Sequence, residues 1–137
     1  MHINNLFTLA LAASTSISVS AIAIAGSSIS SDTMLADEFT NSVTCGQKNP
    51  AINMVIEDYC NRDDLTVGTP FARGGINHNG IKVNVIGPNC PANSKWIPHK
   101  WCTAQFHHLC ANVAGPEGQG WMRFGANQCQ TWTIQKI

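Results

Sequence analysis

Apolar residues recur at helical spacing in two stretches of this chain, and both stretches predict a helix. After Asn49, a residue type that caps helix starts, and Pro50, apolar residues return every three or four positions as far as Tyr59. A second stretch follows Pro98 and ends at Gly115-Pro116. Its apolar stripe consists of Cys102, Phe106, Leu109, Cys110 and Val113. We therefore expect one helix that ends near residue 60 and another after residue 98.

Alternating apolar and polar residues predict strands between and after these helices. Ile81, Val83 and Val85 alternate with polar residues, and Asn79-Gly80 suits a type I′ turn that would pair residues 75–78 with residues 81–84. Two further strands are expected over residues 121–124 and 130–134. This order predicts an α+β fold, in which an antiparallel sheet of about four strands carries two helices as an α-β-α sandwich, stapled by up to three disulfides.

The first 25 residues are apolar and uncharged, which predicts a signal peptide over residues 1–25 and a secreted, extracellular protein. Ala23 and Ala25 supply the small residues of a cleavage site, and the Ser/Thr interruptions argue against a membrane anchor. Residues 26–44 show no clear period and are interpreted as a flexible lead-in or a short pro-segment. Residues 45–137 are then expected to form a single disulfide-rich α+β domain.

The cysteines lie only in this expected domain, and secretion predicts that they are oxidised. They are Cys45, Cys60, Cys90, Cys102, Cys110 and Cys129. Six cysteines allow about fifteen pairings, among which the sequence does not choose. Position favours Cys110 with Cys129, and Cys45 with Cys60 or Cys90 with Cys102 are further local candidates. No C-x-x-C pair occurs, so no metal site is expected.

Charge and motifs mainly exclude functions. The 8 basic and 8 acidic residues balance and are scattered, so neither nucleic-acid binding nor insertion into a membrane is expected. No motif of a known hydrolase or phosphate-binding loop occurs, and we expect no enzymatic activity and no cofactor. Asp63-Asp64 is interpreted as a solvated turn.

The histidines are the strongest argument for an enzyme. His99, His107 and His108 cluster on the second helix, and His78 lies in the predicted hairpin. Two of them could serve as acid and base in a small secreted ribonuclease. Solvent-facing histidines without a catalytic or metal role are the simpler expectation.

Two tryptophans are the candidate ligand-binding residues. Trp96 and Trp121 stand in or beside Gly/Pro-rich loops, where an indole face could stack on a sugar ring or anchor a protein interface. Trp132 alternates with Ile134 on a predicted strand and is expected in the core.

The arrangement of cysteines and elements also resembles that of known secreted proteins. The residues that carry the likeness are Thr44-Cys45, Tyr59-Cys60, Cys102-Thr103-Ala104-Gln105-Phe106, Leu109-Cys110, Trp121 and Cys129-Gln130-Thr131-Trp132. The chain resembles the mushroom glycan-binding proteins with an α-β-α sandwich and, more distantly, the necrosis-inducing extracellular effector domains of plant-pathogenic fungi. The resemblance implies a secreted, non-enzymatic protein that acts by binding.

The sequence therefore predicts a cysteine-rich fungal effector, a virulence or avirulence protein that binds a host protein or an extracellular glycan. It would act in the host apoplast or after translocation into the host cell. A lectin-like glycan-binding defence protein and a secreted ribonuclease are the alternatives. Whether the protein forms a homodimer stays open.

Overall fold

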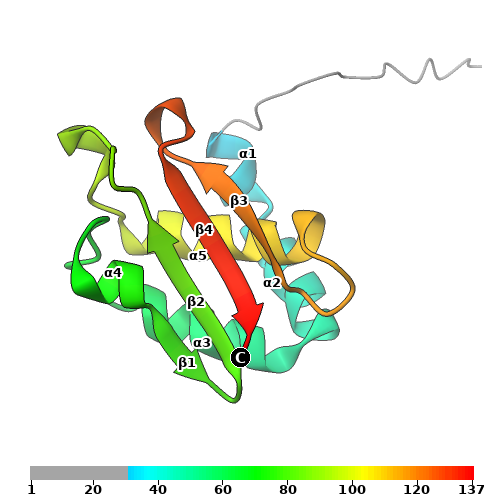
Figure 1. Ribbon diagram of the computed structural model, residues 1–137. Helices are drawn as coiled ribbons and strands as arrows, with labels where there is room; N and C mark the ends of the chain where they lie inside the picture. Colours follow the sequence, from blue (N-terminus) through cyan, green and yellow to red (C-terminus); the bar gives the residue numbers. More distant parts are fainter. Residues whose placement is uncertain (1–30) are drawn as a thin grey trace, which may run out of the picture.

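The computed structural model describes residues 31–137, which form a four-stranded antiparallel sheet and a layer of helices (Figure 1). The predicted signal peptide lies outside the described residues. The helices are α1 Ser31–Ala36, α2 Glu38–Lys48, α3 Pro50–Cys60, α4 Pro70–Gly74 and α5 His99–His108. The strands are β1 Ile76–His78, β2 Ile81–Ile86, β3 Gly120–Phe124 and β4 Gln130–Lys136. The α+β class and the four antiparallel strands confirm the prediction.

The last strand of the chain lies inside the sheet, because the strand order is β1-β2-β4-β3. The predicted hairpin turn joins β1 to β2, and Asn79 and Gly80 have the positive φ of a type I′ turn, 50° and 77°. β4 pairs antiparallel with β2 on one side and with β3 on the other. β1 and β3 are therefore the two edges of the sheet.

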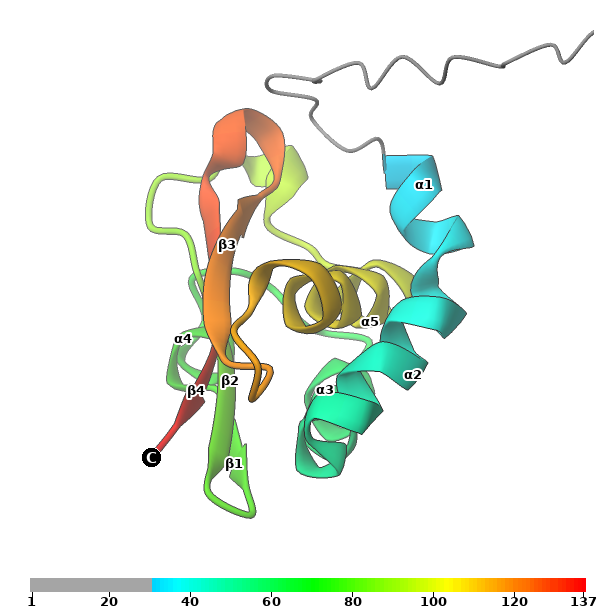
Figure 2. The same cartoon turned by 90° about the vertical axis from the view of Figure 1, so that its right-hand side faces the viewer.

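The two predicted helices, α3 and α5, pack on one face of the sheet, and α2 packs against both of them (Figure 2). α3 begins as expected, since the side chain of Asn49 accepts a hydrogen bond from the Ala51 N–H at 3.1 Å. The core centres on Trp132 of β4, which is fully buried. The rings of Phe106 and Phe124 lie 4.6 and 5.4 Å from its ring, so Trp132 is a core residue as predicted.

Helices α1 and α2 correct the expectation for the segment before the first cysteine. A flexible lead-in was predicted over residues 26–44, but from Ser31 onward this segment is helical. Met34 on α1 and Cys45 on α2 are buried, so the packed unit begins before residue 45. Phe39 is 81% exposed, and the segment buries too few apolar side chains to leave a period in the sequence.

Three disulfides join cysteines that are far apart in the sequence. Cys45–Cys110 joins α2 to the end of α5, Cys60–Cys102 joins α3 to α5, and Cys90–Cys129 joins the loop after β2 to the start of β4. The predicted use of all six cysteines in disulfides is confirmed, but all three local pairings are wrong. For Cys45 and Cys60 the reason is α3, since Cys45 lies near the end of α2 beside the start of α3, whereas the eleven residues of α3 carry Cys60 to its far end, about 16 Å of helix away.

A lysine from α2 closes the C-terminal end of the α5 helix. Here α5 continues into one turn of π-helix, Leu109–Val113. The Nζ atom of Lys48 donates hydrogen bonds to the carbonyl oxygens of Cys110, Ala111 and Ala114 at 2.8, 2.8 and 3.2 Å. These carbonyl oxygens lie at the last turn of the helix, where no later backbone N–H group of the helix can donate to them.

The same turn explains one error in the predicted apolar stripe. Val113 is 47% exposed, because the stripe was drawn with the period of a regular α-helix and the π-helical turn before Val113 is wider. The remaining members of the stripe are buried as predicted: Cys102, Phe106, Leu109 and Cys110.

Candidate functional site

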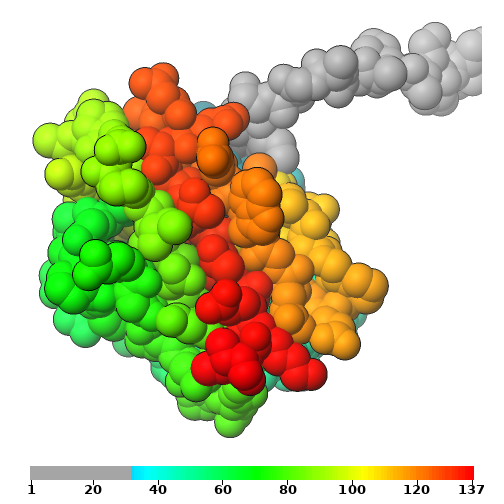
Figure 3. Space-filling view, viewed as in Figure 1, coloured from blue at the N-terminus to red at the C-terminus, as the bar shows by residue number. Residues whose placement is uncertain are grey.

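One face of the sheet carries none of the longer helices α2, α3 and α5, which all lie on the other side (Figures 1 and 2). Burial alternates along β2, β3 and β4, so every second side chain points away from the core. We call these outward side chains the open face. They are Lys82, Asn84 and Ile86 of β2, Trp121 and Arg123 of β3, and Thr131, Thr133 and Gln135 of β4. In the space-filling view of Figure 3 the strands form much of the surface turned to the viewer.

Trp121, the first predicted ligand-binding residue, stands on the open face and is 62% exposed. The strand register places it opposite Thr133, which in turn lies opposite Asn84, so an indole, a hydroxyl and an amide form one row across three strands. In the next row Arg123 lies opposite Thr131. Trp121 and Arg123 also line a shallow hollow of about 530 Å³ at the β3 edge. The row of Trp121, Thr133 and Asn84 thus offers an aromatic surface with hydrogen-bonding groups beside it.

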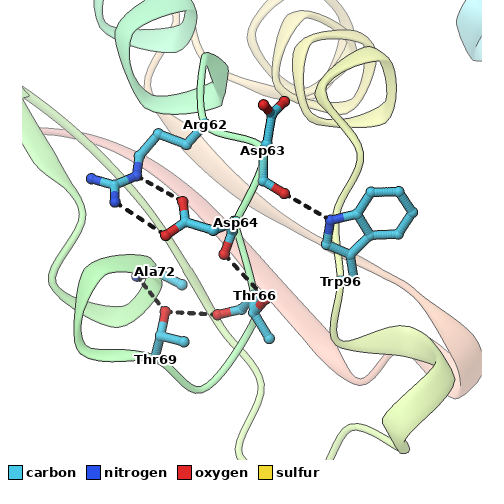
Figure 4. Close-up of polar contacts among 7 residues, drawn as sticks. All are labelled: Arg62, Asp63, Asp64, Thr66, Thr69, Ala72 and Trp96. Carbon is cyan, nitrogen blue, oxygen red and sulfur yellow. Dashed lines mark hydrogen bonds and ion pairs between the residues drawn. The ribbon is translucent and has the colours of Figure 1, made fainter.

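Trp96, the second predicted ligand-binding residue, lies elsewhere and is held by the backbone (Figure 4). Its indole N–H donates a hydrogen bond to the carbonyl oxygen of Asp63 at 3.0 Å, and its backbone forms an isolated bridge with Thr66. Trp96 is 61% exposed and lines a hollow of about 120 Å³ together with Trp101. The structure therefore places the two candidate tryptophans in separate hollows.

A third hollow, of about 450 Å³, lies between α4 and the loop that follows β2. We call it the basic hollow; it is lined by Gly68, Arg73, Ile86, Gly87, Pro88 and Lys95. Ile86 belongs to the open face, and the Asn84 side chain donates a hydrogen bond to the Arg73 carbonyl oxygen at 3.4 Å. The basic hollow is thus a continuation of the open face beyond β2.

Sequence reasoning missed the basic hollow and the contribution of Trp101. Arg73 and Lys95 are far apart in the chain, and only the folding of α4 and of the loop after β2 against the end of β2 brings them together. One signal was present, since the four strands contain basic residues but neither Asp nor Glu.

Two of the histidines are buried, so the expectation of solvent-facing histidines is wrong for them. His107 and His108 lie under α1 and α2 and are 1% and 7% exposed. Burial lowers the pKa of His107, while Glu38 of α2 and Glu57 of α3 act in the opposite direction. Neither ring nitrogen of His107 has a hydrogen-bond partner among the described residues; the nearest acid oxygen, on Glu38, is 3.7 Å from Nδ1.

His108 belongs to a polar contact between α5 and α2. The Asn112 side chain lies 3.3 Å from His108 Nδ1 and donates to the Asn41 side chain at 2.8 Å. Burial lowers the pKa of His108, and the charge of Asp37 opposes this shift. His108 therefore takes part in the packing of α2 on α5.

The remaining histidines and the acid pair do not form one group. His78 lies 3.4 Å from the Asp58 carboxylate beside the hairpin, and His99 is exposed at the start of α5. Asp64 accepts two hydrogen bonds from the Arg62 guanidinium, at 3.0 and 3.2 Å, which lower the pKa of that carboxyl (Figure 4). Asp63 is exposed and contributes its carbonyl to Trp96, which agrees with a solvated turn.

Within residues 31–137, no His, Cys, Asp and Glu side chains gather in a group of three or more that could hold a metal ion. In the same part of the chain, no helix combines the length and the apolar character needed to cross a membrane.

No protein-family model, no curated protein and no solved structure matches this chain. The resemblance to mushroom glycan-binding proteins and to fungal effector domains therefore stays a prediction.

Proposed function

We propose that this protein is a secreted, non-enzymatic binding protein of the fungal effector class, a virulence or avirulence protein that contacts its target through the open face. The observation that carries the proposal is Trp121. An indole that is 62% exposed, on an edge strand of a sheet face without a long helix over it, has no role in the core. Exposed aromatic residues of this kind anchor interfaces, because their burial on binding releases a large apolar area from water.

The scaffold behind the open face supports this proposal. Two disulfides tie α2 and α3 to α5, and the third ties the loop beside the basic hollow to β4. Disulfides persist in oxidising compartments, which fits the expected signal peptide over residues 1–25 and a secreted protein. A rigid sheet that is fixed in this way presents its side chains without a large loss of entropy on binding.

Glycan binding is the second candidate, and the row formed by Trp121, Thr133 and Asn84 favours it. A sugar ring can stack its apolar face on the indole while its hydroxyl groups bond to the neighbouring threonine and asparagine. The ribonuclease hypothesis receives less support from the geometry. His107 and His108, two of the histidines it could use, are buried under α2.

Expression in plant leaf tests the effector proposal. The chain is expressed with and without residues 1–25, and cell death or immune suppression is scored for the wild type and for Trp121→Ala. We expect a response from the wild type with the leader and a loss of that response in Trp121→Ala. A response from both proteins would show that the open face is not the contact surface, and silence of the wild type in both forms would overturn the effector proposal.

Phe39→Ala is the matched control. Phe39 is also an exposed aromatic residue, but it lies on α2, on the opposite side of the molecule from the open face. This variant should act like the wild type. A glycan array with the oxidised protein tests the second candidate: saturable binding that Trp121→Ala abolishes supports it, and an array on which the wild type binds nothing rules it out.

A further inference from the structure

The charges of this protein are separated in space, although they cancel in number. The four strands carry Lys82 and Arg123 on the open face and Lys136 at the end of β4, but no acidic residue. The basic hollow adds Arg73 and Lys95. Most of the acidic residues lie instead on or between α1, α2 and α3: Asp32, Asp37, Glu38, Glu57 and Asp58. The helix side is therefore acidic, while the open face and the basic hollow are basic.

The cations on the helix side already have partners. Lys48 donates to three carbonyl oxygens, Arg62 pairs with Asp64, and the Nζ atom of Lys100 lies 5.6 Å from the centre of the Trp101 ring. The positive charges of these three residues already interact with carbonyl oxygens, a carboxylate and an aromatic ring. Little of that charge is therefore left for a ligand.

The cations of the open side do not have such partners. Arg73, Lys82, Lys95 and Arg123 form no ion pair with any residue between 31 and 137. The nearest acidic residues along the chain from the basic hollow are Asp63 and Asp64, and Asp64 is neutralised by Arg62. These four cations are therefore available to a ligand.

The cations flank a surface that suits sugar rings. Ile86, Gly87 and Pro88 line the basic hollow between Arg73 and Lys95. From Ile86 the register runs across Thr131 to Arg123, two strand spacings or roughly 10 Å away. Trp121 and Thr133 occupy the next row. An extended chain of a few rings would thus meet a cation at each end of the row, with the Thr131 hydroxyl between them and the Trp121 indole in the row beside it.

We propose that the open face and the basic hollow bind an anionic polysaccharide, a chain of sugar units that carry carboxylate or sulfate groups. This inference rests on the proposed binding function and names its ligand class. Guanidinium groups bind carboxylate and sulfate oxygens in pairs, and lysine adds a point charge. Nucleic acid fits less well, since four separated cations in a chain of zero net charge form no continuous basic stripe.

Binding of the full oxidised protein to defined polysaccharides tests the inference. Polygalacturonate supplies carboxylates, dextran sulfate supplies sulfates, and fully methyl-esterified polygalacturonate has the first backbone without its charge. Titration calorimetry should detect binding to at least one of the acidic polymers and none to the neutral ester. The affinity should fall when NaCl rises from about 50 to about 500 mM, because salt screens exposed charges.

Substitutions then locate the site. In the double variant Arg73→Gln with Lys95→Gln the affinity should fall about tenfold, and Arg123→Gln should lower it several-fold, as expected for the loss of exposed charge contacts. Lys100→Gln on α5 is the matched control and should stay within about twofold of the wild type. Circular dichroism of each variant checks that the fold is kept.

The possible failures are distinct. If the neutral ester binds as tightly as the acidic polymers, charge does not determine binding, although the protein still binds a glycan. Equal affinity for polyglutamate and single-stranded RNA would overturn the glycan class in favour of general binding of polyanions. If no polymer binds but Trp121→Ala still abolishes the response in leaf, the anionic ligand is wrong and the proposed function stands.

Discussion

The indole N–H of Trp96 donates a hydrogen bond to the backbone carbonyl of Asp63 at 3.0 Å, and this contact joins the loop before α5 to the loop after α3. Trp96 is thus partly a structural residue, although 61% of it is exposed. Trp96→Phe keeps the ring and removes the N–H. We expect the free energy of unfolding to fall by about 1 kcal/mol, measured by urea denaturation.

Trp121→Phe is the control for this prediction. No hydrogen bond of the Trp121 indole occurs among the described residues, so its stability should change by less than about 0.5 kcal/mol. Equal stability of Trp96→Phe and the wild type would show that the contact with Asp63 contributes nothing.

Removal of the Cys60–Cys102 disulfide should lower the free energy of unfolding more than any single surface substitution does. This disulfide spans 42 residues and joins α3 to α5 beneath the sheet. The chain-entropy estimate for a loop of this size is about 4 kcal/mol, and the double variant Cys60→Ala with Cys102→Ala should lose that amount in a denaturant titration. A loss below about 1 kcal/mol would mean that the packing of α3 on α5 holds without the crosslink.

Acid should destabilise the fold through His107. Its pKa is lowered by burial in the folded state, so the unfolded chain takes up a proton near pH 6.5 while the folded chain does not until the pH is lower. Stability is therefore present above pH 6.5 and is lost as the pH falls below it, until the folded form is protonated as well. Glu38 and Glu57 reduce the size of this effect, and His108 adds to it.

The variant His107→Leu tests whether His107 causes the loss of stability in acid. The variant removes a buried imidazole whose nitrogens lack hydrogen-bond partners in the described part of the chain, so we expect a gain of about 1 kcal/mol at pH 7. Its unfolding midpoint should also change less than that of the wild type between pH 7 and pH 5. The same slope in both proteins would assign the acid sensitivity to other groups.

Lys48 should matter to stability although it is a lysine on a short helix. Lys48→Met keeps the apolar stem and removes the three hydrogen bonds to the end of α5. We expect a loss of about 2 kcal/mol in thermal or denaturant unfolding, because bonds from a charged donor to otherwise unpaired carbonyls are involved. Lys100→Met, which removes a cation that has no hydrogen bond of this kind, should stay close to the wild type.

The sequence predicted those elements whose signals are local. Asn49 and Pro50 mark the start of α3, Asn79-Gly80 marks the hairpin, and both lie where the structure has them. These signals are read within a few residues because capping and turn conformations depend on the side chain at that position.

The features that depend on distant packing could not be predicted. The cysteine pairs follow from how α2 and α3 lie against α5, and the burial of His107 follows from the same contact. Phe39 and Val43 left α2 without an apolar period, because its larger apolar residues face outward. Of the candidate site, Trp121 was found from its loop context, whereas the basic hollow required the placement of α4 beside β2.

The overlap of the three disulfides along the chain has a consequence for resistance to proteolysis. A single cut between Cys45 and Cys110 leaves both fragments joined by that bridge, and a cut between Cys110 and Cys129 leaves them joined by Cys90–Cys129. One nick anywhere across this span therefore releases no fragment. Within residues 45–129, a protease must cut at least twice, or a reductant must act first, before a piece of the chain is released. The segments outside that span, α1 with most of α2 and the strand β4, lack this protection.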